Sequence, residues 1–203
     1  MLGNLIRIFF SWYIDRAVTK HFAAFSYSEI IVDPERAVLM IANHFSWWDG
    51  FLMFQINRKL LKRNFHVMVT EENYKKVFFF KHLGAFCIKR NSKSAIDSLN
   101  TAGKLLNDKK NMVLIFPQGK LFSNHIDDVW FEKGLLNIIN SSEKCFQYLF
   151  SSVFVDYFEK QKPSAYGYLQ LWEDKEPINL QLLKDAYNQH YSKSRQLQCR
   201  ITL

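Results

Sequence analysis

Residues 37–50, which read AVLMIANHFSWWDG, decide the fold of this chain. The six apolar residues 37–42 predict a strand buried on both faces, because a strand with one solvated face would alternate with polar residues. A short polar segment follows, and residues 50–62 then carry apolar positions three or four apart, which predicts a helix. A buried strand that leads directly into a helix is typical of parallel sheets with crossover connections.

The same alternation continues along the rest of the chain. Five further strands are predicted, at residues 65–70, 86–89, 112–116, 153–157 and 166–172. Further helices are predicted at residues 72–82, 93–107, 131–141 and 180–191. We therefore expect an α/β fold with a largely parallel mixed sheet flanked by helices.

The N-terminal segment has a composition of its own. Apolar residues recur at helical spacing within a segment that also carries basic residues, as in Leu5, Ile6, Phe9, Phe10 and Tyr13. Charged residues interrupt the run well below the ~20 apolar residues that a bilayer crossing needs. Two interpretations are open: an amphipathic helix that lies in a membrane interface, or one that docks on the protein's own core. We expect a membrane-associating helical segment at residues 1–30 and a single α/β domain at residues 31–203.

Charge and cysteine content limit the possible functions. The formal net charge is +8, which favours anionic lipid, nucleic acid or phosphorylated substrates. Lys and Arg are dispersed and no nucleic-acid-binding signature is present, so we expect no nucleic-acid partner. The three cysteines are far apart in the sequence and fit neither a disulfide framework nor a metal site.

His44 and Asp49 are the candidate catalytic pair. A histidine followed five positions later by aspartate, in a turn before a helix, can fold back so that the carboxylate meets one imidazole nitrogen. The other nitrogen is then free to take a proton from an attacking hydroxyl. A histidine hydrogen-bonded within a loop is the structural alternative. The sequence has no serine-nucleophile elbow, so direct attack by an acceptor hydroxyl is simpler than a covalent enzyme intermediate.

Three ordered blocks carry a family resemblance. Residues 43–50 (Asn-His, four residues, Asp-Gly) resemble the first signature block of the PlsC-like glycerophospholipid acyltransferases. Residues 84–90, a glycine before an apolar strand that ends in arginine, resemble the second block. Residues 113–119 (VLIFPQG) resemble the third, and residues 131–134 are similar to the segment that follows it.

The resemblance implies an acyltransferase, and the availability of its acyl donors together with the N-terminal helix predicts membrane association at the cytoplasmic face. The enzyme would move an acyl chain from acyl-CoA or acyl-carrier protein to a hydroxyl of a lysophospholipid-like acceptor, without a metal or bound cofactor. His44 and Asp49 would be its base and orienting carboxylate. The residues that the resemblance assigns to the acceptor site are Arg90, as a phosphate contact, with Phe116, Pro117, Gln118, Gly119 and Lys120.

Departures from the family pattern fall on the acceptor side. Gln118 stands where the family has glutamate, and Leu121 stands where it has arginine, with Lys120 one residue earlier. A fourth family block, normally a proline between apolar residues at the end of a strand, would correspond to residues 153–155, which lack the proline. An acceptor without a phosphate, such as lyso-ornithine or another amino-acid lipid or an aromatic or polyene lipid, is therefore also compatible with the sequence. So are a catalytically silent lysolipid-binding membrane module and a hydrolase that uses the same dyad with water.

Overall fold

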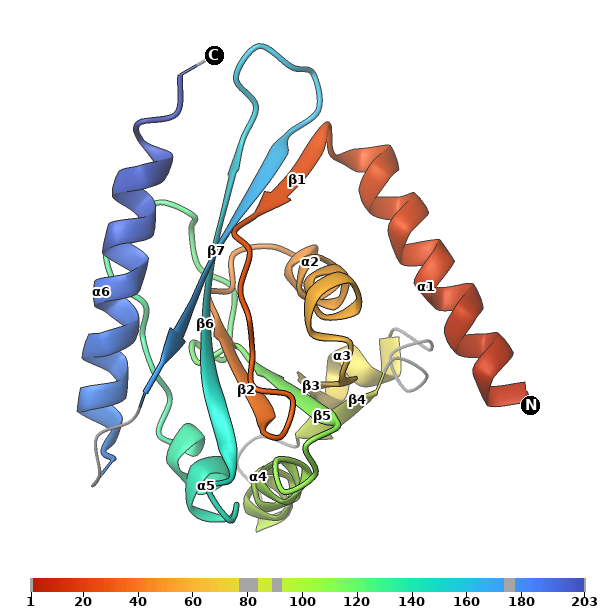
Figure 1. Ribbon diagram of the computed structural model, residues 1–203, viewed down its shortest axis with the longest axis vertical. Helices are drawn as coiled ribbons and strands as arrows, with labels where there is room; N and C mark the ends of the chain where they lie inside the picture. Colours follow the sequence, from red (N-terminus) through yellow and green to blue (C-terminus); the bar gives the residue numbers. More distant parts are fainter. Residues whose placement is uncertain (1, 77–83, 89–92, 174–177, 203) are drawn as a thin grey trace.

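The protein forms a seven-stranded mixed sheet covered by helices on both faces (Figure 1). The computed structural model describes residues 2–76, 84–88, 93–173 and 178–202. The strands are β1 (Ala24–Tyr27), β2 (Ala37–Ala42), β3 (Asn64–Thr70), β4 (Ala85–Ile88), β5 (Asn111–Ile115), β6 (Phe146–Asp156) and β7 (Ser164–Trp172). The helices are α1 (Leu2–His21), α2 (Asp49–Ile56) with a π-helical turn η1 (Asn57–Leu61), α3 (Glu71–Lys76), α4 (Lys93–Leu105), α5 (Gly134–Asn140) and α6 (Leu180–Gln198).

Most of the sheet is parallel, as the sequence predicts. Its strand order is β1-β7-β6-β2-β5-β3-β4. The five strands from β6 to β4 run in one direction, β7 is antiparallel to β6, and β1 is parallel to β7. The predicted α/β fold with a largely parallel mixed sheet is therefore confirmed.

The largest differences from the sequence prediction concern β1, β6 and α6. β1 is a strand that the apolar pattern does not predict, and it pairs with β7 through Ala24 and Ser164. β6 begins at Phe146, seven residues before its predicted start, because polar residues in its first half interrupt the apolar pattern although they are buried. α6 continues to Gln198, beyond the predicted end at Tyr191, over a polar stretch that the apolar periodicity misses.

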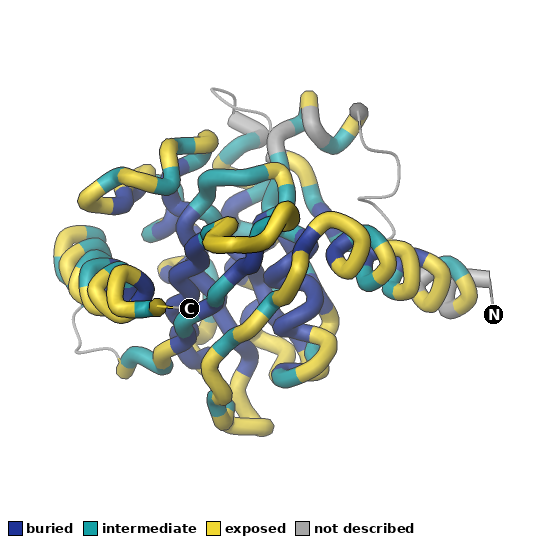
Figure 2. Tube along the Cα trace, turned by 90° about the horizontal axis from the view of Figure 1, so that it is seen from above, coloured by how far each residue is buried: buried dark blue, intermediate teal, exposed yellow. Residues whose placement is uncertain are grey.

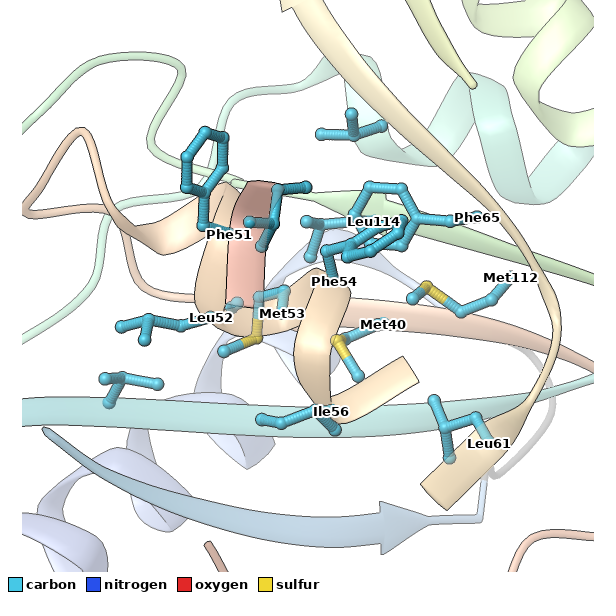
Figure 3. Packing of buried hydrophobic residues seen from close by; sticks show 14 of the residues in the cluster. Met40, Phe51, Leu52, Met53, Phe54, Ile56, Leu61, Phe65, Met112 and Leu114 are labelled. Atoms are coloured by element: carbon cyan, nitrogen blue, oxygen red, sulfur yellow. The ribbon is translucent and has the colours of Figure 1, made fainter. Parts of the chain in front are cut away.

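Two apolar layers cover the two faces of the sheet. β2 divides between them, since Val38, Met40 and Ala42 face one cluster while its other residues face the second. The first layer contains α1 and α2, and Figure 3 shows side chains from α2 packed around Met40 and Met112. The second layer contains α4, α5 and α6. Figure 1 shows α6 on the opposite side of the sheet from α1 and α2.

Helix α1 has apolar residues on two sides. Phe10, Ile14, Val18 and Phe22 recur every four residues and are buried in the first layer. A second apolar stripe faces outward, with the side chains Leu5, Ile8, Phe9, Trp12 and Tyr13 between 39% and 65% exposed. Figure 2 shows this helix projecting from the body of the molecule. The helix thus docks on the core, and it also presents an apolar surface.

No helix within the described residues is both long enough and apolar enough to cross a membrane. The expected boundary at residue 30 stays a prediction. β1 lies within that N-terminal segment and extends the sheet, so the segment contributes both a helix and an edge strand to the fold.

Gly84 shows why the second sequence block begins with glycine. Its φ is +79°, and a Cβ at this position would lie 1.8 Å from the carbonyl oxygen of Phe65 on the neighbouring strand β3. Any side chain here would push β4 away from β3.

Candidate active site

The site lies where β2 and β5 end side by side. The two strands are parallel neighbours, and Ile41 pairs with Ile115, so the residues that follow them meet at one edge of the sheet. The imidazole of His44 stacks on the ring of Phe116, with 4.2 Å between ring centroids and 16° between planes. Two segments about 70 residues apart in sequence thus form one surface.

His44 and Asp49 form a close pair. His44 Nδ1 lies 2.8 Å from Asp49 Oδ2, and the same oxygen accepts hydrogen bonds from the backbone N–H groups of Phe45 and Ser46 at 2.8 and 2.9 Å. Three donors to one oxygen fix both the carboxylate and the turn that carries the histidine. With Nδ1 engaged, Nε2 is the nitrogen that can exchange a proton with a substrate.

Burial dominates the electrostatics of Asp49. The residue is 1% exposed, and burial raises the pKa of its carboxyl above the ordinary value, while the hydrogen bond from His44 and the two backbone donors oppose that rise. Asp49 also begins α2, where the positive end of the helix dipole favours a negative charge. The His44 side chain is 24% exposed, so the imidazole is accessible while its carboxylate partner is not.

Asn43 anchors the turn to the sheet. Its side chain donates to the carbonyl oxygen of Val153 at 2.9 Å and accepts from the N–H of the same residue at 2.8 Å. The β2–β6 ladder ends at the pair Ala42 and Ser151, so the amide adds one further rung beyond it. His44 therefore starts from a backbone position that β6 holds in place.

Gln118 supports the same histidine from the turn after β5. It is 1% exposed, and its Oε1 accepts the backbone N–H of His44 at 2.6 Å. A tight turn places it there: the N–H of Gly119 donates to the carbonyl oxygen of Phe116 at 3.1 Å, and Gly119 has a φ of +64°. The Gln118 side chain is thus directed at the main chain of His44.

A protein-family model matches the part of the sequence that forms this site. The Acyltransferase family model, which describes the PlsC-type glycerolipid acyltransferase domain, matches residues 24–151. The chain belongs to the PlsC-type acyltransferase family. It is an acyltransferase enzyme of that family. A search of curated proteins gave no significant match.

The remaining predicted site residues of the acyltransferase divide into two groups. Pro117, Gly119 and Lys120 lie in the turn after β5, next to His44; the carbonyl oxygen of Pro117 accepts from Glu132, and Lys120 is exposed with its ammonium 5.2 Å from the ring of Phe122. Arg90 lies outside the described residues.

The described part of the acyltransferase has no group of His, Cys, Asp and Glu that could hold a metal ion. Two polar side chains beside the site, those of Asn43 and Gln118, form hydrogen bonds with the main chain. Asn43 belongs to the first sequence block, but the sequence pattern gives it no role. The sequence signal that could indicate the role of Asn43 is an amide directly after a fully buried strand, because a buried amide needs partners for both its donor and its acceptor.

Proposed function

We propose that this acyltransferase moves a fatty acyl chain from a thioester donor, acyl-CoA or acyl-carrier protein, to a hydroxyl of a lysophospholipid-like acceptor. His44 is the general base in this proposal, and Asp49 orients it and stabilises its protonated form. The observation that carries the proposal is the 2.8 Å contact between His44 Nδ1 and the buried Asp49 carboxylate.

The proposed reaction uses the free imidazole nitrogen twice. His44 Nε2 removes the proton of the acceptor hydroxyl as its oxygen attacks the thioester carbonyl. The tetrahedral intermediate then expels the thiolate, which takes the proton from the imidazolium, so that one C–O bond forms and one C–S bond breaks. Asp49 keeps its negative charge throughout and stabilises the positive ring.

The acceptor is assigned to the surface beside β5. Arg90, Phe116, Pro117, Gln118, Gly119 and Lys120 are the proposed acceptor-binding residues. Lys120 supplies a cation one position before Leu121, where the family has arginine, but a lysine is a point charge without the forked donors of a guanidinium. This difference keeps amino-acid lipids such as lyso-ornithine as an alternative acceptor class.

The outward stripe of α1 supports membrane association at the cytoplasmic face, where thioester donors occur. The exposed Phe9 and Trp12 belong to this stripe, and Trp47, which is 53% exposed, lies in the turn between His44 and Asp49. Trp48 connects the two regions, because its ring contacts His21 and Phe22 at centroid distances of 4.8 and 5.4 Å. The helix that carries the stripe therefore contacts the catalytic turn at its C-terminal end.

Acyl transfer is tested with labelled palmitoyl-CoA and palmitoyl-carrier protein and a panel of lysophosphatidic acid, lyso-ornithine lipid and other hydroxylated lipids. We expect His44→Ala to lower kcat by about 10²- to 10⁴-fold, the usual contribution of a general base. Asp49→Asn should also be impaired. Asp108→Asn is the matched control, since its exposed carboxylate accepts a local backbone N–H at the opposite end of β5. Transfer that survives His44→Ala would refute the assigned base.

Membrane association is tested by sedimentation with vesicles that contain anionic lipid. The double variant Phe9→Ser/Trp12→Ser should lose most of the bound fraction, because both side chains are exposed and contribute apolar area to the interface. The solvent-facing double variant Ile96→Ser/Leu197→Ser is the control, as both residues are similarly exposed on other helices. Equal binding of the two double variants would refute the role of α1.

A further inference from the structure

Helix α6 directs one stripe of side chains at the segment 120–130. It begins at Leu180, outside the family-matched region, and four of its residues with spacings of four, three and four contact this segment. Such spacing places side chains on one face of a helix. The four residues are Lys184, Asn188, Tyr191 and Arg195.

Asn188 makes the most specific of these contacts. Its Oδ1 accepts the N–H of Val129 at 2.7 Å, and its Nδ2 donates to the carbonyl oxygen of Val129 at 3.2 Å. Val129 is fully buried, so both of its backbone groups depend on partners within the protein. One side chain therefore satisfies a whole peptide position, as a neighbouring strand would.

The other three residues extend the contact along the segment. The Tyr191 hydroxyl and Arg195 Nη1 both donate to the carbonyl oxygen of Ile126 at 3.3 Å, and Arg195 Nη1 lies 2.7 Å from Asp127 Oδ1. The ammonium of Lys184 lies 5.0 Å from the ring of Trp130. Asp127 is 85% exposed, so its ion pair is worth little and the backbone contacts carry the effect.

The segment and the residues just after it contact both turns of the candidate site. The N–H of Phe122 donates to the carbonyl oxygen of His44 at 3.0 Å, and the N–H of Glu132 donates to that of Pro117 at 2.8 Å. Residues 120–130 contain no helix or strand, so backbone ladders do not hold them. Their position depends on these contacts with the site and with α6, together with the packing of Val129 and Ile126 in the second apolar layer.

Helix α6 is itself fixed to the sheet. Tyr187 is fully buried, and its hydroxyl donates to the carbonyl oxygen of Ser151 at 2.7 Å. Ser151 is the last β6 residue in the ladder with β2, just below Asn43. The helix can therefore act as a rigid support that relates the segment to the catalytic turn.

We propose that α6 holds residues 120–130 as the acceptor-facing wall of the site, with Asn188 as the main positioning residue. This inference rests on the proposed transfer to a lipid acceptor. The segment carries the chemistry that an amphiphilic acceptor requires, since Lys120 supplies a cation while Leu121 and Trp130 are 54% and 59% exposed. In this proposal Asn188 does not contact the acceptor; it acts by positioning residues 120–130.

The test compares Asn188→Ala with Gln189→Ala, whose side chain is an exposed amide on the next residue of the same helix. Asn188→Ala should raise the KM for the acceptor by about tenfold, the factor expected for the loss of one or two hydrogen bonds, and leave the KM for the thioester donor unchanged. Backbone amides in residues 120–130 should exchange hydrogen faster than in wild type. Gln189→Ala should match wild type in both measurements.

Asn188→Asp provides a second variant that keeps the acceptor for the Val129 N–H and loses the donor, so its effects should be intermediate. An unchanged acceptor KM in an active Asn188→Ala enzyme, or equal losses for donor and acceptor, would overturn the inference. If wild type itself transfers no acyl group, the proposed function fails. The exchange measurement then still decides whether α6 holds the segment.

Discussion

The hydrogen bonds of Asn43 allow a quantitative prediction for Asn43→Ala. The change removes both bonds to Val153 and leaves its N–H and carbonyl group without their partner in a buried position. A typical hydrogen bond contributes about 1 kcal/mol net, and a buried group left unpaired costs about 1–3 kcal/mol. We therefore expect a loss of about 2–4 kcal/mol in the free energy of unfolding.

The assay is urea unfolding followed by circular dichroism, with transfer activity measured at a temperature where the variant is folded. For a chain of this size a loss of about 3 kcal/mol corresponds to a melting temperature lower by about 6–12 °C. Activity should fall by about tenfold or more, because His44 follows directly on the displaced anchor and small misplacements of catalytic groups are costly.

Asn140→Ala is the control, since this asparagine is exposed at the end of α5, and its stability should stay within about 0.5 kcal/mol of wild type. A loss below about 1 kcal/mol in Asn43→Ala, together with an unchanged rate, would show that Asn43 does not anchor the turn.

Three further changes test other parts of the structure. Burial lowers the pKa of His190 to about 4 from 6.5. The free energy of unfolding should therefore fall by about 3 kcal/mol as pH drops from 6.5 toward 4, because the unfolded chain takes up the proton first, and should be unaffected by His190 above pH 6.5. Urea unfolding of His190→Gln should lack this pH dependence. Gly103→Ala would place a Cβ 2.0 Å from Ser141 Oγ and should cost about 1–3 kcal/mol in thermal unfolding, whereas no loss would mean that the two helices separate freely. Gln118→Leu removes the acceptor for the His44 N–H and should lower kcat by about tenfold, while Gln118→Glu, which keeps an oxygen there, should retain more activity; equal rates in the two variants would contradict this role.

The central strands could be predicted because their burial is uniform. β2 and β5 are buried at every residue, and β2 is apolar throughout, so its run of side chains has one interpretation. The start of β6 was missed because its burial includes polar side chains with distant partners. Gln147, for example, donates to the carbonyl oxygens of Asp33 and Arg36. From the sequence alone, a polar residue such as Gln147 indicates the end of a strand, because its buried hydrogen-bond partners are not apparent.

The short strand β1 was not predicted from the sequence for a different reason. It has only four residues, alternates between exposed and half-buried, and pairs with β7 alone. Its local pattern is too short to distinguish a strand from a loop. The pairing that defines it depends on the arrangement of the whole sheet.

Within the candidate site, the sequence motif predicted that His44 and Asp49 lie close together but not how their turn is held. The separation of His44 and Asp49 by five residues allowed their contact to be inferred locally. The contacts of Asn43 with Val153 and of Gln118 with His44 span 110 and 74 residues. They follow from the register of β2 with its two neighbours, which the sequence pattern does not specify.

The position of β1 has a consequence for biosynthesis. Its sheet partner begins at Ser164, about 140 residues later in the chain, and α1 immediately precedes it. A ribosome would therefore release both elements long before β7 exists, so the newly made N-terminal segment would wait without its strand partner. The outward apolar stripe of α1 would be exposed during this interval, and its inward side would be uncovered until α2 has been made. Chaperones or a nearby bilayer would then have access to the nascent chain well before the enzyme could complete its sheet.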